Sequence, residues 1–469
     1  MGGKPWIRSV IAVLGCVPAL GACVGSDAVT SAADSTAAAR PASSVSPGPP
    51  AVEPFPSVPA VEDCREALKV DCYTPDMVRR AYGVDRLNAQ GLTGKGRTVA
   101  VFAGYAPPTL EKDLREFSRA MELPEPHLTV RKINSGVTPA PFDPSNPAMI
   151  TASMETTLDV QMVHTMAPDA KIVVAEYAQA AFPRRFSSSS ASPEDGKKSG
   201  EQDAEAYPEL LAAIVRQDDP DVISLSVGDN EYRAAGDTGA PVAAYRRASR
   251  SFAEVLRGGT TLVSAAGDAG AAPPIGPDNT RVRSVSWPAS DPSFLSLGGS
   301  RLHLDARGRR TGPDTVWNDS AQGRGATGGG PSQTFTRPAY QDGVRGVVGE
   351  RRGTPDISMD AATSGGTLIY QSLLPAGPGW VPIGGTSEAA PLFAAVVALA
   401  DEKAGRRLGD IHDELYRLAK DPRGGIVDIT EGDNGPDGFA AAKGYDLASG
   451  LGTIDAATFV PALARLADG

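Results

Sequence analysis

Short apolar runs alternate with amphipathic stretches along most of the chain after residue 97. The runs are rich in β-branched residues and have the length of buried strands: 97–103 (RTVAVFA), 171–177 (KIVVAEY), 221–227 (DVISLSV) and 260–266 (TTLVSAA). Stretches with apolar positions at helical spacing lie between them, at 108–121, 155–166, 207–216 and 242–257. This alternation predicts an α/β fold with a parallel β-sheet and helices on both faces.

The first 23 residues differ from the rest. Lys4 and Arg8 precede an apolar run at 9–20, which is too short to span a bilayer as a helix. This order of charge and apolar run is typical of a secretory signal. The sequence LGAC at 20–23 resembles a bacterial lipobox, so we expect an extracellular or cell-surface chain, anchored to the membrane through a lipid on Cys23. An ordinary cleaved signal with an incidental cysteine is the alternative.

Composition divides the remaining chain into two parts. Residues 24–62 are mainly Ala, Ser, Pro and Val, and such a segment buries too little apolar surface to fold, so we expect a flexible tether. Residues 63–469 form the expected folded domain, with a polar insertion at about 183–206. Cys64 and Cys72 lie at its start, and we expect them to form a disulfide in an oxidising compartment.

The net charge of the chain limits the class of molecule that it can bind. The formal net charge is -11, from 45 Lys and Arg against 56 Asp and Glu. Phosphate contacts need clustered cationic side chains, and no basic stripe is present, so nucleic acid is excluded as the main partner.

A glycine-rich turn before a predicted helix carries the clearest candidate nucleophile. The sequence GGTSEAAP at 384–391 leads into an apolar run at 392–399. Such a turn places Ser387 at the positive end of a helix and near main-chain N–H groups. These conditions suit a nucleophile and the stabilisation of an oxyanion. A capped structural helix is the alternative for this octapeptide taken alone.

The turn is similar to the nucleophile motifs of two families, the subtilisin-like enzymes and the sedolisins (serine-carboxyl peptidases). The two families differ in the base that activates the serine. A subtilisin-like triad needs a histidine followed by glycine. None of the histidines in this chain has that context: His127, His164, His303 and His412.

Carboxylates supply the alternative base. Glu155 and Asp159 are four residues apart and therefore share one face of a predicted helix. The segment 162–177 (MVHTMAPDAKIVVAEY) resembles the helix, Ala-Pro-x-Ala turn and buried strand of sedolisins. Asp268, in AAGDAGA at 265–271, matches the sedolisin segment whose aspartate helps to form the oxyanion hole. A solvated acidic helix face and a plain strand-end turn are the alternatives.

The resemblance to sedolisins extends from about residue 73 to the C-terminus. Further shared motifs are YTP at 73–75, GKG at 94–96, SLSVG at 224–228, WPASDP at 287–292, GGG at 328–330 and PAYQ at 338–341. The resemblance implies a subtilisin-like fold and a peptidase that acts on proteins or peptides, as an endopeptidase or a tripeptidyl-peptidase.

The resemblance also assigns the catalytic roles. Ser387 would attack the scissile carbonyl, and Glu155 would accept its proton and return it to the leaving amine. Asp159 would orient Glu155 and share a proton with it, and a protonated Asp268 would donate to the oxyanion. Because two close carboxylates cannot both ionise cheaply, we expect activity at acid pH.

A calcium ion is implied near the C-terminus. The segments DI at 428–429 and GYDLASGLG at 444–452 match the calcium loop of the family. By that match, one structural Ca²⁺ would bind the carboxylates of Asp428 and Asp446 and the main-chain oxygens of Ile429, Ala442 and Gly444. Oxygen ligands suit this hard cation. An acidic surface loop is the alternative.

Two features depart from the family pattern. About fifty residues separate Cys23 from Tyr73, so we expect the long folded prodomain of sedolisins to be missing. Val227 stands where many members have an aromatic residue, which bears on substrate preference. We expect a monomer that meets the membrane only through its anchor.

Two other functions compete with the acid peptidase. The first is a catalytically silent surface lipoprotein that keeps the fold and binds peptides or a partner. The second is a subtilisin-like enzyme working near neutral pH, which requires a histidine beside Ser387.

Overall fold

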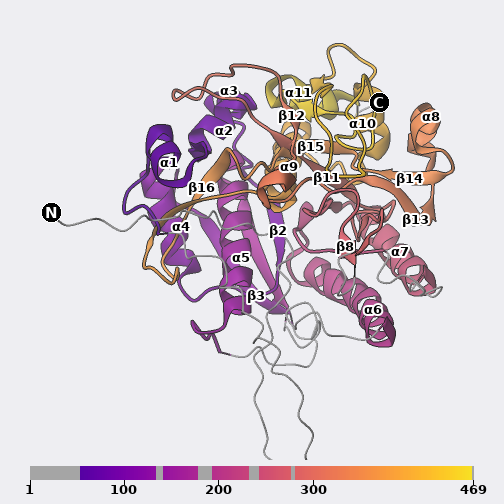
Figure 1. Ribbon diagram of the computed structural model, residues 1–469, viewed down its shortest axis with the longest axis horizontal. Coiled ribbons are helices and arrows are strands. Elements are labelled where there is room, and N and C mark those ends of the chain that lie inside the picture. The colour runs from indigo at the N-terminus through magenta and orange to yellow at the C-terminus, as the bar shows by residue number, and fades with distance from the viewer. Residues whose placement is uncertain (1–52, 134–140, 178–192, 232–241, 276–279, 467–469) are drawn as a thin grey trace, which may run out of the picture.

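The structure is a computed structural model, and it describes residues 53–133, 141–177, 193–231, 242–275 and 280–466 (Figure 1). The predicted signal and lipobox at 1–23, and most of the predicted tether, lie outside these residues. The helices are α1 (Val61–Leu68), α2 (Pro75–Ala81), α3 (Val84–Ala89), α4 (Leu110–Ala120), α5 (Pro147–Met166), α6 (Pro193–Asp218), α7 (Val242–Arg257), α8 (Arg345–Val348), α9 (Thr386–Ala404), α10 (His412–Leu418) and α11 (Ala456–Leu466).

The strands fall into one large sheet and several short pairs. They are β1 (Cys72–Tyr73), β2 (Thr98–Ala103), β3 (His127–Ile133), β4 (Lys171–Tyr177), β5 (Val222–Leu225), β6 (Asp229–Asn230), β7 (Thr261–Ala265), β8 (Pro274–Ile275), β9 (Thr280–Arg281), β10 (Ser286–Trp287), β11 (Leu295–Arg301), β12 (Thr315–Val316), β13 (Gly330–Thr336), β14 (Arg351–Thr354), β15 (Ile357–Asp360), β16 (Gly366–Gln371), β17 (Gly379–Ile383), β18 (Ile426–Val427) and β19 (Thr453–Ile454).

The large sheet has the order β12-β11-β7-β5-β2-β4-β3, and β15 also pairs with β11. All pairings in it are parallel except that of β12 with the end of β11. The predicted α/β fold with a mostly parallel sheet is therefore confirmed.

Both faces of this sheet are buried, and this explains the nearly continuous apolar runs in the sequence. On β2, Val99 and Val101 belong to one hydrophobic core, whereas Ala100 and Phe102 belong to a second core on the other face. The buried helices α5 and α9 cover the first face, and α6 and α7 pack together on the second (Figure 1).

The folded body begins before the boundary that composition predicts. Phe55, inside the predicted tether, pairs its main chain with that of Trp380 at 2.9 and 2.8 Å, and α1 already begins at Val61. Phe55, the aromatic residue of this segment, packs against the hydrophobic core and so fixes the chain at this point. The predicted disulfide between Cys64 and Cys72 is present, and their Cα atoms are 5.9 Å apart.

Part of the predicted polar insertion at 183–206 is helical. Residues 183–192 lie outside the described part of the chain, but α6 begins at Pro193 and includes the rest. Its polar composition concealed this helix, because the apolar spacing becomes regular only after residue 206. Similarly, α5 begins at Pro147 rather than 155, since the side chain of Asn146 caps it by accepting from the main-chain N–H of Ala148.

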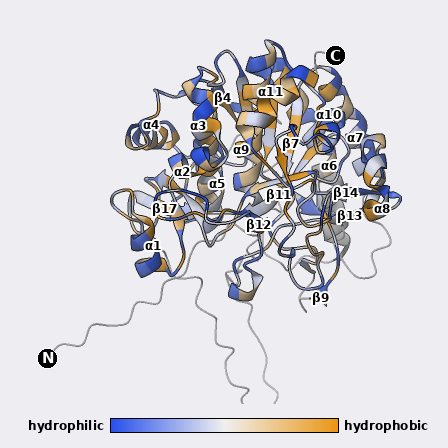
Figure 2. Cartoon of the chain, turned by 90° about the horizontal axis from the view of Figure 1, so that it is seen from above, coloured by the Kyte–Doolittle hydropathy of each residue, from blue (hydrophilic) through white to orange (hydrophobic). Residues whose placement is uncertain are grey.

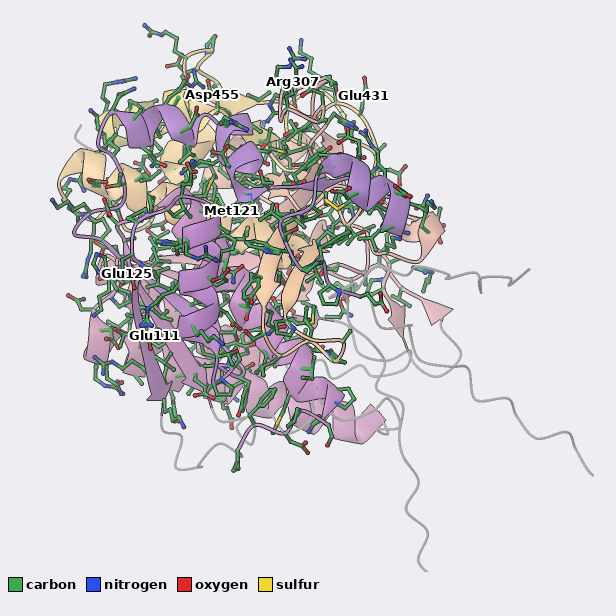
Figure 3. The ribbon with its side chains drawn as sticks, turned by 90° about the vertical axis from the view of Figure 1, so that its left-hand side faces the viewer. Glu111, Met121, Glu125, Arg307, Glu431 and Asp455 are labelled. Carbon is green, nitrogen blue, oxygen red and sulfur yellow. A yellow bond between two sulfur atoms is a disulfide. The ribbon has the colours of Figure 1, made fainter. Side chains whose placement is uncertain are left out.

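Charged residues lie mainly on the outside, and apolar residues line the central strands such as β7 (Figure 2). Arg115 on α4 forms ion pairs with Glu111 and Glu125. Both acids lie on the side of the molecule that faces the viewer in Figure 3. Such exposed pairs contribute at most about 1 kcal/mol each. Among the described helices, none combines the length and apolarity that crossing a bilayer requires.

Candidate active site

Ser387 lies in the first turn of α9, directly after the turn that leaves β17. Gly385 has φ of 118°, a left-handed conformation that favours glycine, and it starts the helix. The Ser387 side chain is 5% exposed and lies at the positive end of a helix of 19 residues. The apolar run at 392–399 keeps this helix buried against β5, β7 and β11, which fixes the position of the serine.

Glu155 and Asp159 lie one turn apart on α5, which packs along α9. Burial raises the pKa of Glu155, a hydrogen bond from Ser387 opposes this rise, and the charge of Asp268 adds to it. The structure therefore places the predicted nucleophile near the predicted base, close enough for the Ser387 hydroxyl to lower the pKa of Glu155.

The carboxyl of Asp159 is buried beside Glu155. Burial raises its pKa well above the ordinary value, the charge of Glu155 raises it further, and a hydrogen bond from Ser226 opposes the rise. Because each carboxylate raises the cost of ionising the other, the pair retains a proton where isolated carboxyls would have lost theirs.

Asp268 follows β7 and meets the start of α9. Its Oδ1 accepts the main-chain N–H of Thr386 at 2.8 Å and the Thr386 hydroxyl at 2.7 Å. That hydroxyl in turn accepts the N–H of Gly267 at 3.0 Å. Burial raises the pKa of Asp268 to about 6, and the two hydrogen bonds from Thr386 moderate the rise.

All four predicted catalytic residues thus converge where β5 and β7 end and α9 begins. The carboxyl ends of parallel strands are the usual place for ligands in open α/β sheets. Sequence reasoning missed Ser226 and Thr386, which hold Asp159 and Asp268. Ser226 lies in the SLSVG motif and Thr386 in the GGTSEAAP motif. A sequence motif alone does not reveal contacts between distant segments.

The histidines contact residues other than Ser387. His412 contacts Asp410 at 2.6 Å and the carbonyl of Phe294 at 3.1 Å, and His303 contacts Thr315 at 3.0 Å. Burial lowers the pKa of His164 to about 4, and His127 lies exposed on the edge strand β3. The Ser387 hydroxyl therefore contacts the main-chain carbonyl of Ser226 and lies near the Glu155 carboxyl rather than near an imidazole.

Glu388, the neighbour of the candidate nucleophile, faces another part of the molecule. It forms a short hydrogen bond with the Thr367 hydroxyl on β16. Burial raises its pKa well above the ordinary value, and the charge of Asp360 adds to the rise. Its contacts support the packing of α9 against the β16–β17 hairpin.

The predicted calcium ligands lie together in the loop between β18 and β19. Asp428 Oδ2 accepts the N–H of Gly444, and Asp446 Oδ2 accepts the N–H of Ala442, both at 2.9 Å. Within the described part of the chain, the main-chain oxygens of Ile429, Ala442 and Gly444 accept no hydrogen bond. Two carboxylates and three free carbonyl oxygens form a donor set that fits Ca²⁺.

Side-chain clusters in the described part of the chain offer no second candidate metal site. No group of three or more His, Cys, Asp or Glu side chains suited to a metal occurs among the residues that the structure describes.

Comparison with known proteins supports the resemblance. The subtilase family matches residues 148–410, which is more than half of the chain. Kumamolisin from Bacillus sp. (strain MN-32) is 29% identical over 396 residues, covering 81% of this chain and 62% of kumamolisin. Sedolisin from Pseudomonas sp. (strain 101) is 34% identical over 244 residues, covering 50% of this chain and 39% of sedolisin. The chain thus spans less than two thirds of the length of these curated relatives.

A solved structure agrees with these matches. Pseudomonas sedolisin, a serine-carboxyl proteinase complexed with two molecules of pseudo-iodotyrostatin, superposes with a TM-score of 0.66 at 26% identity. The superposition covers 83% of this chain and 97% of that one. The fold is therefore subtilisin-like, and the chain belongs to the subtilase family and, within it, to the sedolisins.

Proposed function

We propose that this chain is an exported serine-carboxyl peptidase that hydrolyses peptide bonds of proteins or peptides at acid pH. The observation that carries the proposal is that Ser387 lies beside the buried acidic pair Glu155 and Asp159, while none of the four histidines is its neighbour. The membership of the chain in the sedolisins agrees with it.

Ser387 Oγ attacks the scissile carbonyl carbon, and Glu155 accepts the hydroxyl proton. The tetrahedral intermediate collapses as Glu155 returns this proton to the leaving amine, which leaves an acyl-enzyme on Ser387. A water molecule then attacks the acyl group by the same route. Asp159 shares a proton with Glu155 and orients it, so that Glu155 is ionised toward Ser387 while the pair carries a single negative charge.

Asp268 stabilises the oxyanion. Its Oδ1 is occupied by the two hydrogen bonds from Thr386, which leaves Oδ2 to carry the proton. Protonated Oδ2 donates to the developing oxyanion, whereas an ionised carboxylate repels it. A proton on Asp268 also removes a charge that raises the pKa of Glu155, so it favours the basic form of Glu155. Both effects favour peptidase activity at acid pH.

The loop at 428–446 would hold one calcium ion through Asp428, Asp446 and the carbonyl oxygens of Ile429, Ala442 and Gly444. The bound ion would supply positive charge that ties the two carboxylates to the loop. Export and a lipid anchor at Cys23 rest on the sequence of the first 23 residues.

Digestion of a denatured protein at pH values from 3 to 8 tests the function. We expect the parent to cleave at acid pH and to lose activity toward neutrality, and Ser387→Ala to leave the substrate intact while remaining folded by circular dichroism. Equal cleavage by parent and Ser387→Ala would show that another group is the nucleophile. A folded parent that cleaves at no pH would favour the silent binding protein.

A further inference from the structure

Ser226 connects the acidic pair to the helix that carries the nucleophile. It follows the last residue of β5, and its hydroxyl donates to Asp159 Oδ1 at 2.7 Å. The hydroxyl oxygen of Ser226 also lies 3.3 Å from the main-chain carbonyl oxygen of Ser387. In the other direction, Ser387 Oγ lies 3.4 Å from the main-chain carbonyl of Ser226.

The hydroxyl of Ser226 has one proton for its two acceptors. The contact with Asp159 is the shorter one, and a hydrogen bond to a carboxylate is about twice as strong as a neutral one. The proton therefore points to Asp159, and the contact with the Ser387 carbonyl is secondary. With Oδ1 held in this way, rotation of the Asp159 carboxyl is restricted.

We propose that Ser226 is a positioning residue for catalysis, because its hydroxyl fixes Oδ1 of Asp159 and so directs the other oxygen, with the shared proton, toward Glu155. This inference rests on the proposed peptidase function. Ser226 itself does not take part in proton transfer. It acts by setting the orientation of Asp159 and by stabilising the ionised form of the pair.

Other acids near α5 have partners of their own. From the segment after β7, Asp268 acts on Glu155 and is held by Thr386. On α9, Glu388 contacts Thr367. The other acids on α9 are Asp401, which accepts from the N–H of Leu408, and Glu402, which accepts from the N–H of Thr93. On α4, Asp113 accepts from Ser372, while Glu111 and Glu116 pair with Arg115 and Arg119. Glu176 on β4 accepts from the N–H of Ala106, and Asp76 on α2 pairs with Arg79. Ser226 is therefore the neutral donor that acts directly on Asp159.

Removal of the Ser226 hydroxyl should change the acid limb of the pH–activity profile, where activity rises with pH. The pKa of Glu155 is raised to about 8 while Asp268 is charged, and a proton on Asp268 removes one cause of that rise. With Asp268 protonated, activity rises with pH as the acidic pair loses its first proton, and it falls as Asp268 ionises. Because the hydrogen bond from Ser226 stabilises the charged pair, its loss raises the pKa that governs the acid limb. A hydrogen bond to a charged group corresponds to a shift of about one pH unit. The neutral limb, set by Asp268, stays in place.

The experiment compares the pH dependence of kcat and KM for a peptide substrate in the parent, Ser226→Ala and Ser226→Thr. For Ser226→Ala we expect an acid limb about one pH unit higher, a kcat lower by about ten-fold or more and a KM within about two-fold of the parent. Ser226→Thr keeps the hydroxyl, so its acid limb stays at the pH of the parent even where the extra methyl lowers kcat.

Ser224→Ala is the matched control. Ser224 lies two residues earlier, on the buried strand β5, and its hydroxyl has no hydrogen-bond partner among the described residues. Its pH profile should equal that of the parent. An acid limb unchanged in Ser226→Ala, or shifted equally in Ser224→Ala, would overturn the role of Ser226. Cleavage by Ser387→Ala would instead overturn the proposed function itself, so the two failures are distinguishable.

Discussion

Gly385 and Asp268 approach so closely that a Cβ on Gly385 would lie 2.7 Å from Asp268 Oδ2. On its other side, the same carboxyl is held by Thr386. The absence of a side chain at residue 385 therefore leaves Oδ2 in place at the start of α9. The glycine meets two needs at once, since its φ of 118° also disfavours any other residue.

Gly385→Ala should lower kcat/KM by about 100-fold or more, because the added methyl displaces Asp268, the proposed oxyanion donor. Gly346→Ala is the matched control. Gly346 lies exposed on α8, and an added Cβ would contact nothing within 4 Å. Steady-state kinetics of both variants, with thermal unfolding to confirm folding, test this. Full activity in Gly385→Ala would mean that Asp268 is not the oxyanion donor.

Asp268→Asn should change the pH dependence more than it changes the fold. The pKa of Asp268 is raised to about 6, so the parent loses the donated proton as the pH rises through this value. An asparagine amide donates at every pH, so the decline near pH 6 should disappear while some activity remains. Asp268→Ala has no donor and should lose about 100- to 1,000-fold in kcat. If Asp268→Asn keeps the decline of the parent, another group controls it.

Stability should fall as the pH rises from about 4 to 8. Burial raises the folded-state pKa of Asp401 to about 8, from 3.8 when exposed, so the folded state binds the proton more tightly. The resulting stabilisation is complete below about pH 4 and is lost as the pH rises through about 8. Asp401→Asn removes this ionisation and should flatten the dependence of Tm on pH.

Glu66→Gln is the control for this stability prediction, since it makes the same chemical change at an exposed side chain. Its Tm should follow that of the parent at every pH, measured by differential scanning calorimetry. A Tm of Asp401→Asn that declines with pH as steeply as the parent's would contradict the role assigned to Asp401.

Calcium should bind once per chain and raise Tm. At a free concentration about 100 times Kd, binding stabilises the folded state by about 2.7 kcal/mol. Asp428→Asn weakens one carboxylate ligand and should lower the affinity measured by isothermal titration, together with the calcium-dependent rise in Tm. Glu431→Gln, an exposed acid of the same loop, should leave both unchanged. Equal binding by Asp428→Asn and the parent would place the ion elsewhere.

The buried strands could be predicted from the sequence because both faces of the sheet are covered. Each run of β-branched residues, such as 171–177, coincides with a strand, β4. The position of the candidate nucleophile Ser387 at the start of a helix could also be predicted, since the glycine turn and the following apolar helix are contiguous in the chain. Helix starts were harder to predict, because caps such as Asn146 and the polar beginning of α6 carry no apolar spacing.

Contacts between distant segments could not be predicted in the same way. Ser226 and Asp159 are 67 residues apart, and Thr386 and Asp268 are 118 apart. The direction of Glu388 was equally hidden: its neighbour Ser387 faces the acidic pair, but its own carboxyl turns to Thr367. Only the packing of α5 and α9 determines which of several acidic residues meet the serine.

The rate at which Ser387 is acylated tests most directly whether carboxyl groups activate it. A single-turnover reaction with an activated peptide ester at acid pH, quenched and followed by mass spectrometry, measures this step alone. For Glu155→Gln we expect an acylation rate lower by about 100- to 10,000-fold, because the general base is lost. Glu66→Gln, the matched exposed change, should react like the parent. A rate in Glu155→Gln equal to that of the parent would contradict activation by the acidic pair.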